Sequence, residues 1–207
     1  MLPNPYIIHL ESCKERAQTQ KHLEDIFVSK ITLFHAKQIT WSPKIHWKSH
    51  QGWKEMTPGQ LGCNASHYEL YKSLIGVEYA TIFEDDACAS SPLEKLVEFL
   101  NIVPKTFDIL LLGYNDITSG YSENGYRIVK QFYGTHAMIL NAKARKCFID
   151  EYTEMMSTNT CLPTDWLWSH CISKYRLNCY APMKPSIVQH ESLISCITGK
   201  YRVNTVF

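Results

Sequence analysis

The sequence predicts an α/β fold in which a sheet is flanked by helices. Strand-like and helix-like segments alternate along the chain, as is typical of layered α/β domains. The apolar segment "FDILLLG" (107–113) has the pattern of a strand buried on both faces. With 207 residues, no internal repeat and no linker, the whole chain (1–207) is expected to form one domain.

The first half of the chain predicts three strands and three helices. Capping boxes pair a Ser or Thr with a Glu or Gln three residues later, and they predict where the helices begin. The pairs are Ser12 with Glu15, Thr57 with Gln60, and Ser91 with Glu94. Helices are expected from 12 to 27, from 57 to the stop at Gly76, and from 91 to 100, and strands at 6–10, 31–36 and 78–83. The apolar residues that recur at helical period are Leu61, Ala65, Tyr68, Tyr71 and Ile75 in the second helix and Leu93, Leu96, Val97 and Leu100 in the third.

The second half is predicted from similar patterns. The segment 126–141 indicates two strands, 142–156 a helix, and the part from Pro163 onward a mixed end. Residues 41–56 hold three tryptophans without clear periodicity and are expected to form a long loop, a common place for function.

Composition excludes several classes of partner. Lys and Arg number 21 against 20 acids, and without a basic run nucleic acid is not expected. No apolar stretch approaches the roughly 20 residues of a transmembrane helix, and Pro3, Asn4 and Pro5 interrupt any signal-peptide core. We therefore expect a soluble cytoplasmic protein. The alternatives are a protein that binds at the surface of a membrane and a protein of viral origin. The eight cysteines lack C-x-x-C spacing and are expected to be reduced thiols.

Glu84, Asp85 and Asp86 follow the strand expected at 78–83. At an effective dielectric near 20, each close pair of charges repels by roughly 4 kcal/mol. In an extended backbone Glu84 and Asp86 share one face, at the carboxyl end of a strand where α/β sheets bind ligands. Hard oxygen ligands suit Mg²⁺ or Mn²⁺ with a nucleoside diphosphate, whereas the alternative is a solvated acidic turn.

Four motifs carry a resemblance to a known family: "TPGQLGCNASHYELYKSL" (57–74), "ATIFEDDA" (80–87), "FDILLLG" and "YGTHAMILNAKA" (133–144). In order and spacing they resemble glycosyltransferase family 25, which includes lipopolysaccharide-biosynthesis and collagen β-galactosyltransferases. The resemblance implies a GT-A fold with a Rossmann-like mixed sheet. It also implies a divalent metal (Mn²⁺ or Mg²⁺), a UDP-sugar donor carrying galactose, glucose or N-acetylglucosamine, and inverting transfer to a hydroxyl of a glycan or protein acceptor.

The resemblance also implies roles for the acidic triplet. Asp86 matches the principal metal ligand, and Glu84 or Asp85 would bind the ribose or a metal-bound water. Glu84 is also a second candidate ligand of the metal. His190 is a candidate third ligand, although Gln189 fits the family pattern better and a surface histidine is the alternative.

Further matched residues are candidates with ordinary structural alternatives. Asp165 is the candidate catalytic base, or else a helix N-terminal cap. Arg16 is expected to meet the diphosphate, or else to be an exposed arginine of the first helix. His136 is a candidate donor-binding residue, and both it and His67 are equally explained as hydrogen-bonded core histidines.

Two other classes of protein compete with a glycosyltransferase. One is a catalytically inactive GT-A module that binds a nucleotide-sugar or a glycan. The other is a sugar nucleotidyltransferase, which normally needs a Gly-rich phosphate loop after the first strand; residues 11–16 offer none. His9 and Glu11 also stand where the family tends to place Asn and Asp, so uridine contacts there depart from the family pattern.

Overall fold

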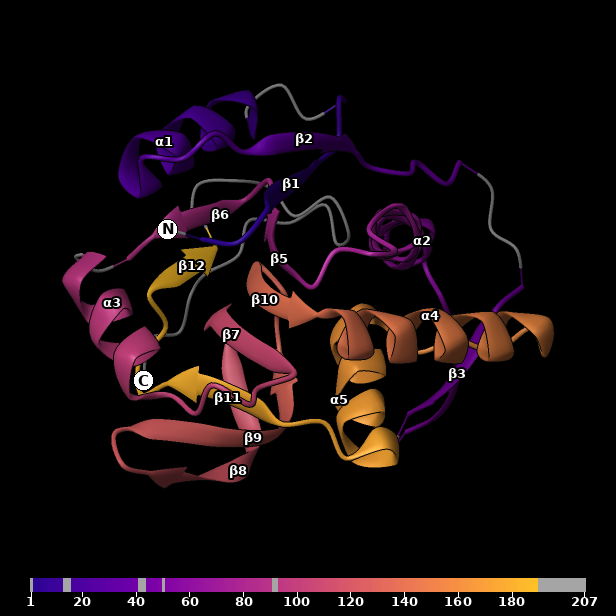
Figure 1. Cartoon of the computed structure of the whole chain (residues 1–207). Coiled ribbons are helices and arrows are strands. Elements are labelled where there is room, and N and C mark those ends of the chain that lie inside the picture. Colours follow the sequence, from indigo (N-terminus) through magenta and orange to yellow (C-terminus); the bar gives the residue numbers. More distant parts are fainter. Residues whose placement is uncertain (1, 13–15, 41–43, 50, 91–92, 190–207) are drawn as a thin grey trace.

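A mixed sheet organises the structure, a computed structural model that describes residues 2–12, 16–40, 44–49, 51–90 and 93–189 (Figure 1). Within these residues the main sheet has ten strands in the order β2-β1-β5-β10-β7-β11-β9-β8, and β12 pairs with β7 and with β6. Its strands are β1 (Pro5–His9), β2 (Thr32–His35), β5 (Tyr79–Glu84), β6 (Ala87–Ala89), β7 (Ile109–Gly113), β8 (Asp116–Glu123), β9 (Tyr126–Tyr133), β10 (Ala137–Asn141), β11 (Cys179–Pro182) and β12 (Ile187–Gln189).

The directions of the strands decide which loops share an edge. β1 pairs in parallel with β2 and β5, whereas β10 runs antiparallel to both β5 and β7. The carboxyl ends of β1, β2 and β5 therefore meet at one edge, and the loop that enters β10 from β9 arrives at the same edge. This edge is where α/β sheets bind their ligands.

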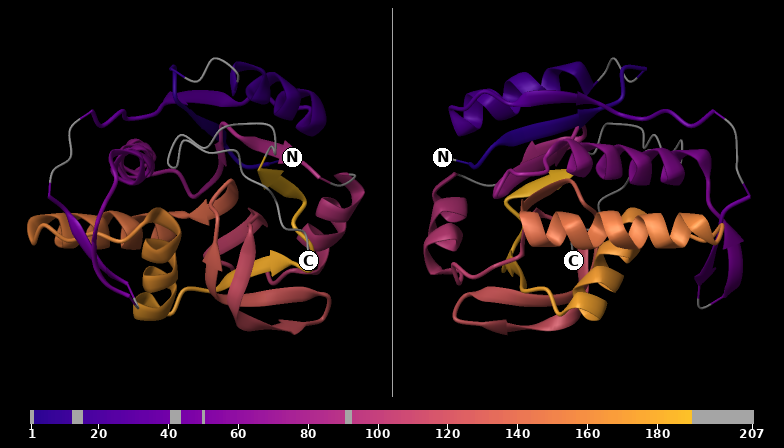
Figure 2. Two further views of the ribbon diagram at one scale, coloured as in Figure 1. Left: turned by 180° about the vertical axis from the view of Figure 1, so that it is seen from behind. Right: turned by 45° about the vertical axis from the view of Figure 1, so that its right-hand side comes forward.

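Helices cover both faces of the sheet, as the opposite views in Figures 1 and 2 show. α2, α4 and α5 pack on one face, and α1 and α3 on the other. The helices are α1 (Ala17–Phe27), α2 (Pro58–Ser73), α3 (Leu93–Ile102), α4 (Ala142–Ser157) and α5 (Thr164–Tyr175).

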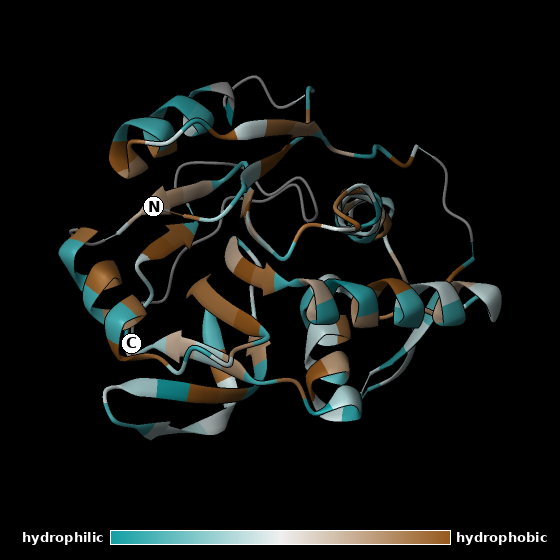
Figure 3. Cartoon of the chain, viewed as in Figure 1, coloured by the Kyte–Doolittle hydropathy of each residue, from teal (hydrophilic) through white to brown (hydrophobic). Residues whose placement is uncertain are grey.

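β7 links the two hydrophobic cores because successive side chains point to opposite faces. Ile109 and Leu111 join the core under α2, α4 and α5, whereas Leu110 and Leu112 join the core under α1 and α3. All five residues of β7 are buried, which confirms the prediction from its apolar run. Figure 3 shows the hydrophobic colour concentrated on this strand, in contrast to the mixed colours of the surrounding helices.

Most predicted elements are confirmed. The strands expected at 6–10, 31–36 and 78–83 correspond to β1, β2 and β5, and those within 126–141 to β9 and β10. The Thr57–Gln60 capping box is formed as expected, and α2 ends at Ser73, shortly before Gly76. Glu15 and Ser91, which belong to the other two capping boxes, lie outside the described residues.

The prediction of a long loop at 41–56 is wrong. Within it, β3 (His46–Ser49) and β4 (Gly52–Glu55) form an antiparallel hairpin that pairs Trp47 with Lys54 and Lys48 with Trp53. Gly52 has a φ of +108°, which glycine adopts without steric cost. Among the described residues, the hairpin lies outside the main sheet, which it contacts through no strand pairing, and is bridged at His46 to Thr160. Its short strands carry no apolar alternation that would indicate a strand. β6 and β8 were also not predicted.

The buried faces of two helices differ from those predicted. In α2 the expected apolar face includes Ile75, which is 80% exposed, whereas the helix buries Asn64, Ser66 and His67. In α3 the core side chains are Leu96 and Phe99, whereas Leu93 and Val97 are exposed. Packing of α2 against the end of β5 and the loop before α5 provides partners for its polar side chains, and periodicity alone does not show this.

Two further findings concern the cysteines and membranes. Six cysteines fall among the described residues with assigned environments, and all six are free thiols, as expected. In the described part of the chain, no helix has both the length and the apolar character needed to cross a bilayer.

We predict that Arg145→Met destabilises the fold. The Arg145 side chain is 2% exposed, and its guanidinium donates hydrogen bonds to the carbonyls of Leu140 (2.7 Å) and Val77. Removing these donors leaves buried carbonyls unpaired, at a cost of about 3 kcal/mol in the free energy of unfolding measured with urea. Lys146→Met, on the exposed face of the same helix, is the control and should cost far less; equal losses would contradict the interpretation.

Candidate active site

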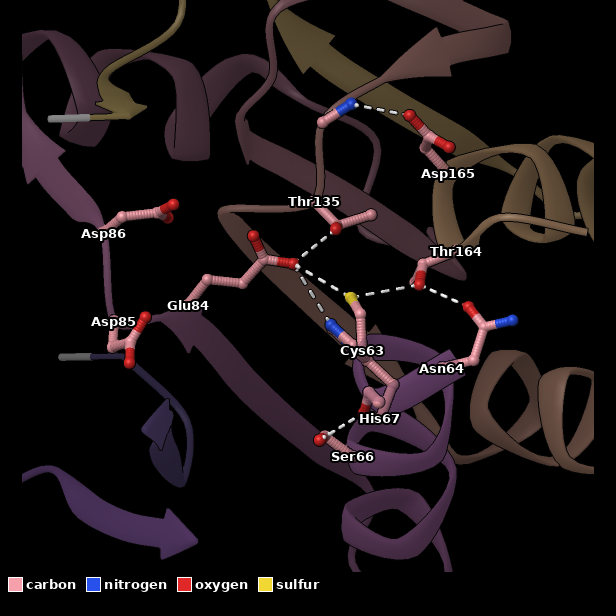
Figure 4. Close-up of polar contacts among 12 residues, drawn as sticks. Cys63, Asn64, Ser66, His67, Glu84, Asp85, Asp86, Thr135, Thr164 and Asp165 are labelled. Carbon is pink, nitrogen blue, oxygen red and sulfur yellow. Dashed lines mark hydrogen bonds and ion pairs between the residues drawn. The ribbon is translucent and has the colours of Figure 1, made fainter. Parts of the chain in front are cut away.

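A cavity of about 500 Å³ lies at the carboxyl ends of β1, β2 and β5. Its wall includes Leu10 after β1 and the segment 36–39 after β2, and it extends to the beginning of α5 at Asp165. All three residues of the acidic triplet also line it. The sheet thus brings the acids of one strand end together with segments that lie far apart in the sequence (Figure 4).

Glu84 is the last residue of β5 and is held by three groups (Figure 4). Its Oε1 accepts hydrogen bonds from Thr135 Oγ1 (2.5 Å) and His67 Nε2 (3.2 Å), and the Cys63 thiol lies 4.0 Å away. Burial raises the pKa of Glu84, but the hydrogen bonds and the charges of His67 and His136 outweigh it and lower the pKa to about 2. Glu84 is therefore ionised at neutral pH.

α2 fixes the orientation of the His67 ring. His67 is 1% exposed, and its Nδ1 lies 2.6 Å from Tyr71 Oη, one helical turn further on. Because an ionised Glu84 can only accept, the Nε2–H of His67 donates to it, and Nδ1 shares a hydrogen bond with the Tyr71 hydroxyl. His67 was interpreted from the sequence as a core histidine; it is buried and hydrogen-bonded, and it also lines the cavity.

Other polar residues of α2 attach neighbouring loops. Asn64 donates to the Leu162 carbonyl (2.8 Å) and accepts from Thr164 Oγ1 (2.5 Å), which fixes the beginning of α5. Ser66 Oγ accepts from the Lys37 N–H (2.8 Å). A Cβ at Gly62 would come within 2.8 Å of the Lys37 carbonyl, so only glycine allows this close approach.

Asp85 ties the acidic triplet to the first strand and helix. Its carboxylate accepts hydrogen bonds from Arg16 Nη1 (2.5 Å) and the Leu10 N–H (2.8 Å), and it lies 3.2 Å from His9 Nδ1. Thr19 donates to its carbonyl. Arg16 is 6% exposed, so the alternative of an exposed arginine is wrong.

Asp86 lies in the turn between β5 and β6, and its carboxylate accepts from Gln189 Nε2 at 3.1 Å. Arg16 Nη1 is 3.5 Å from the same oxygen. From the sequence we expected the backbone to stay extended through Asp86. This expectation is wrong, because β5 ends at Glu84 and residues 85–86 form a turn. Figure 4 nevertheless shows Glu84 and Asp86 directing their carboxylates into the same cavity, while Asp85 is held by the β1 side.

Asp165 is the second residue of α5, and the cap position of this helix is occupied by Pro163. Its carboxylate accepts from the N–H groups of Gly134 (3.3 Å) and Trp166 (2.9 Å). Burial, together with the negative charge of Glu84, raises the pKa of Asp165 above its ordinary value despite these bonds. A carboxylate with a raised pKa at a cavity wall has the properties of a general base.

The cavity has an excess of negative charge. Among its described lining residues are four carboxylates, those of the triplet and Asp165, and only two cationic side chains, Arg16 and Lys37. Glu84 and Asp86 offer hard oxygen atoms, which suit Mg²⁺ or Mn²⁺. The donor set therefore fits a divalent cation of this class.

Not every predicted site residue reaches the cavity. His136 is fully buried and is not among the residues that line the cavity, and its backbone carbonyl accepts a hydrogen bond from the Glu84 N–H (2.9 Å). His190 lies outside the described residues. Cys63, Asn64 and Thr135 were not named as site residues, although the matched motifs contain all three and their polar character within a helix or after a strand was the available signal.

Comparison with solved structures shows the fold. A glycosyltransferase involved in the glycosylation of the major capsid of PBCV-1 aligns with a TM-score of 0.50 at 10% identity, covering 92% of this chain and 94% of that one. A197 from STIV aligns with a TM-score of 0.48 at 11% identity, covering 90% and 83% of the two chains. Mouse xyloside xylosyltransferase 1 aligns with a TM-score of 0.43 at 8% identity, covering 84% and 69%.

The expected GT-A type of mixed sheet flanked by helices is thus confirmed. No curated protein sequence matches the chain. The sequence model described as glycosyltransferase family 25 (LPS biosynthesis protein) matches residues 2–168. Because this match spans most of the chain and includes the acidic triplet and Asp165, the protein belongs to glycosyltransferase family 25.

Proposed function

We propose that this glycosyltransferase uses Mn²⁺ or Mg²⁺ to transfer a hexose from a UDP-sugar to a hydroxyl of a glycan or protein acceptor, with inversion at the anomeric carbon. The observation that carries the proposal is the acidic cavity at the carboxyl ends of three parallel strands. There, oxygen ligands for a cation and a carboxylate with a raised pKa line the same space.

The diphosphate end of the donor belongs beside Asp86. Asp86 is the principal candidate ligand, and Glu84 supplies further oxygen atoms in the same cavity. A bound divalent cation supplies Lewis-acid stabilisation of the charge on the leaving diphosphate. Arg16 lines the cavity next to Asp86 and offers a guanidinium to the phosphate oxygens.

The acceptor end belongs beside Asp165. Inversion requires a base that takes the proton of the acceptor hydroxyl on the side opposite the leaving group. The N–H groups of Gly134 and Trp166 orient the Asp165 carboxylate, so its position does not depend on a flexible side chain alone. Its raised pKa makes it a better proton acceptor than an ordinary aspartate.

Aromatic rings next to Asp165 suit an acceptor sugar. Trp166 is half-buried, and its ring lies 5.9 Å from that of Tyr133 and 5.8 Å from that of Trp47. Flat rings of this kind offer an apolar surface to a pyranose, with a polar edge that reaches water. Trp168, two residues further along α5, is fully buried in the core and does not contribute to this surface.

The first test is turnover itself. Purified protein is incubated with a panel of UDP-sugars and Mn²⁺, and UDP release is measured with and without a chelator. We expect one UDP-hexose to be consumed in preference to the others and the chelator to stop its consumption. Chelator-resistant turnover would contradict the metal role, and UDP binding without turnover of any donor would favour the inactive binding module.

Asp86→Asn is expected to lower kcat at least about 100-fold, because it removes the charge opposite the diphosphate and leaves the size of the side chain unchanged. Thermal unfolding should show that the variant remains folded. Asp25→Asn, on the exposed surface of α1, is the matched control and should keep full activity. Near-normal turnover of Asp86→Asn would refute the assignment.

Asp165→Asn is expected to lower kcat by about 10²- to 10⁴-fold while UDP still binds with the affinity of the unmodified protein. In the unmodified enzyme the base must be deprotonated, so the rate should fall as the pH drops through the pKa of Asp165. Because that pKa is raised, the fall should begin at a higher pH than an ordinary aspartate would give. A pH–rate profile unchanged between the two proteins would exclude Asp165 as the base.

A further inference from the structure

Cys63, His67 and Glu84 bring a sulfur, a nitrogen and an oxygen ligand together in the described part of the chain (Figure 4). The three ligand atoms lie within 4.8 Å of one another. Cys63 and His67 are four residues apart on α2 and therefore share one helix face, while Glu84 closes the group from the end of β5. The cluster thus rests on two rigid elements rather than on a loop.

Two of the three ligand separations are close to those of a tetrahedral zinc site. With Zn–S near 2.3 Å and Zn–N and Zn–O near 2.0–2.1 Å, tetrahedral ligands lie about 3.3 Å apart for N and O and about 3.5 Å apart for S and O. His67 Nε2 is 3.2 Å from Glu84 Oε1, and Cys63 Sγ is 4.0 Å from it. Movements of about 0.5 Å or less would bring both separations to the tetrahedral values.

Each ligand is also oriented by a second hydrogen-bonding group. Tyr71 Oη contacts the other ring nitrogen of His67, and Thr135 donates to the Glu84 carboxylate. Thr164 Oγ1 lies 3.1 Å from the sulfur of Cys63. Outer partners of this kind orient the ligands of metal sites in general, and a metal-bound histidine almost always hydrogen-bonds through its other nitrogen.

We propose that Cys63, His67 and Glu84 bind Zn²⁺ within the cavity. All three residues line the cavity, so an ion can enter and its fourth position faces the open space. The soft sulfur and the imidazole favour Zn²⁺, in contrast to the carboxylate oxygens of Asp86, which suit Mn²⁺ or Mg²⁺. On binding, the metal displaces the proton of the Cys63 thiol, and the imidazole proton of His67 moves from Nε2 to Nδ1, where Tyr71 Oη accepts it in a hydrogen bond.

The zinc site shares Glu84 with the proposed donor site. An ion held there would withdraw this carboxylate from the nucleotide-sugar, so we expect Zn²⁺ to inhibit the turnover supported by Mn²⁺. This consequence rests on the proposed function, whereas binding of the metal to the three side chains does not.

Co²⁺ is the probe for the test, because it replaces Zn²⁺ in tetrahedral sites and absorbs light. The metal-free full chain is titrated with Co²⁺ under reducing conditions. We expect a near-ultraviolet band from thiolate-to-cobalt charge transfer and visible bands of tetrahedral cobalt, saturating at about one equivalent and disappearing when Zn²⁺ is added. Cys63→Ser should lose the charge-transfer band, and His67→Gln should weaken binding at least about tenfold.

The controls separate this site from others. Cys147→Ser, a half-buried thiol of α4, should keep the full cobalt spectrum. Asp86→Asn should also keep it, even though its glycosyl transfer is expected to fail, so the two proposals can fail independently. The absence of the charge-transfer band in the unmodified protein, or its persistence in Cys63→Ser, would overturn the proposal.

Discussion

The arrangement of the site depends on how the buried acids at the end of β5 are compensated. Asp85 is neutralised by Arg16 beside the first strand, and Glu84 is held ionised by His67 and Thr135. Asp86 shares Arg16 and receives a hydrogen bond from Gln189. Protein groups thus orient all three carboxylates, but one arginine balances only part of their charge, and a divalent cation in the cavity would balance the rest.

α2 organises the surroundings of this charge. Its apolar side packs in the core, while its polar side holds the loop after β2 through Ser66 and the beginning of α5 through Asn64. His67 on the same helix reaches Glu84. One helix therefore positions the wall of the cavity, the helix that carries Asp165 and the acid that ends β5. This explains why its small and polar residues lie inside the protein.

Local patterns were sufficient to predict the order of most strands and helices and the edge at which the acids lie. The same patterns were not sufficient for the partners of those acids, because Thr135 is 51 residues from Glu84 in the sequence and only strand pairing brings them together. The apolar period of α2 likewise concealed its buried polar side, since Asn64 is satisfied by residues about 100 positions away. The hairpin β3–β4 was missed because its strands show no apolar alternation and can be recognised only from the hydrogen bonds between them.

The most direct test of the account is the affinity of UDP for the protein, measured by calorimetry with and without Mn²⁺. If the acids hold a cation that receives the diphosphate, the two ligands are linked, and each must strengthen the binding of the other by the same factor. We predict that Mn²⁺ tightens UDP binding at least about tenfold. Equal affinity with and without the metal would contradict the central claim.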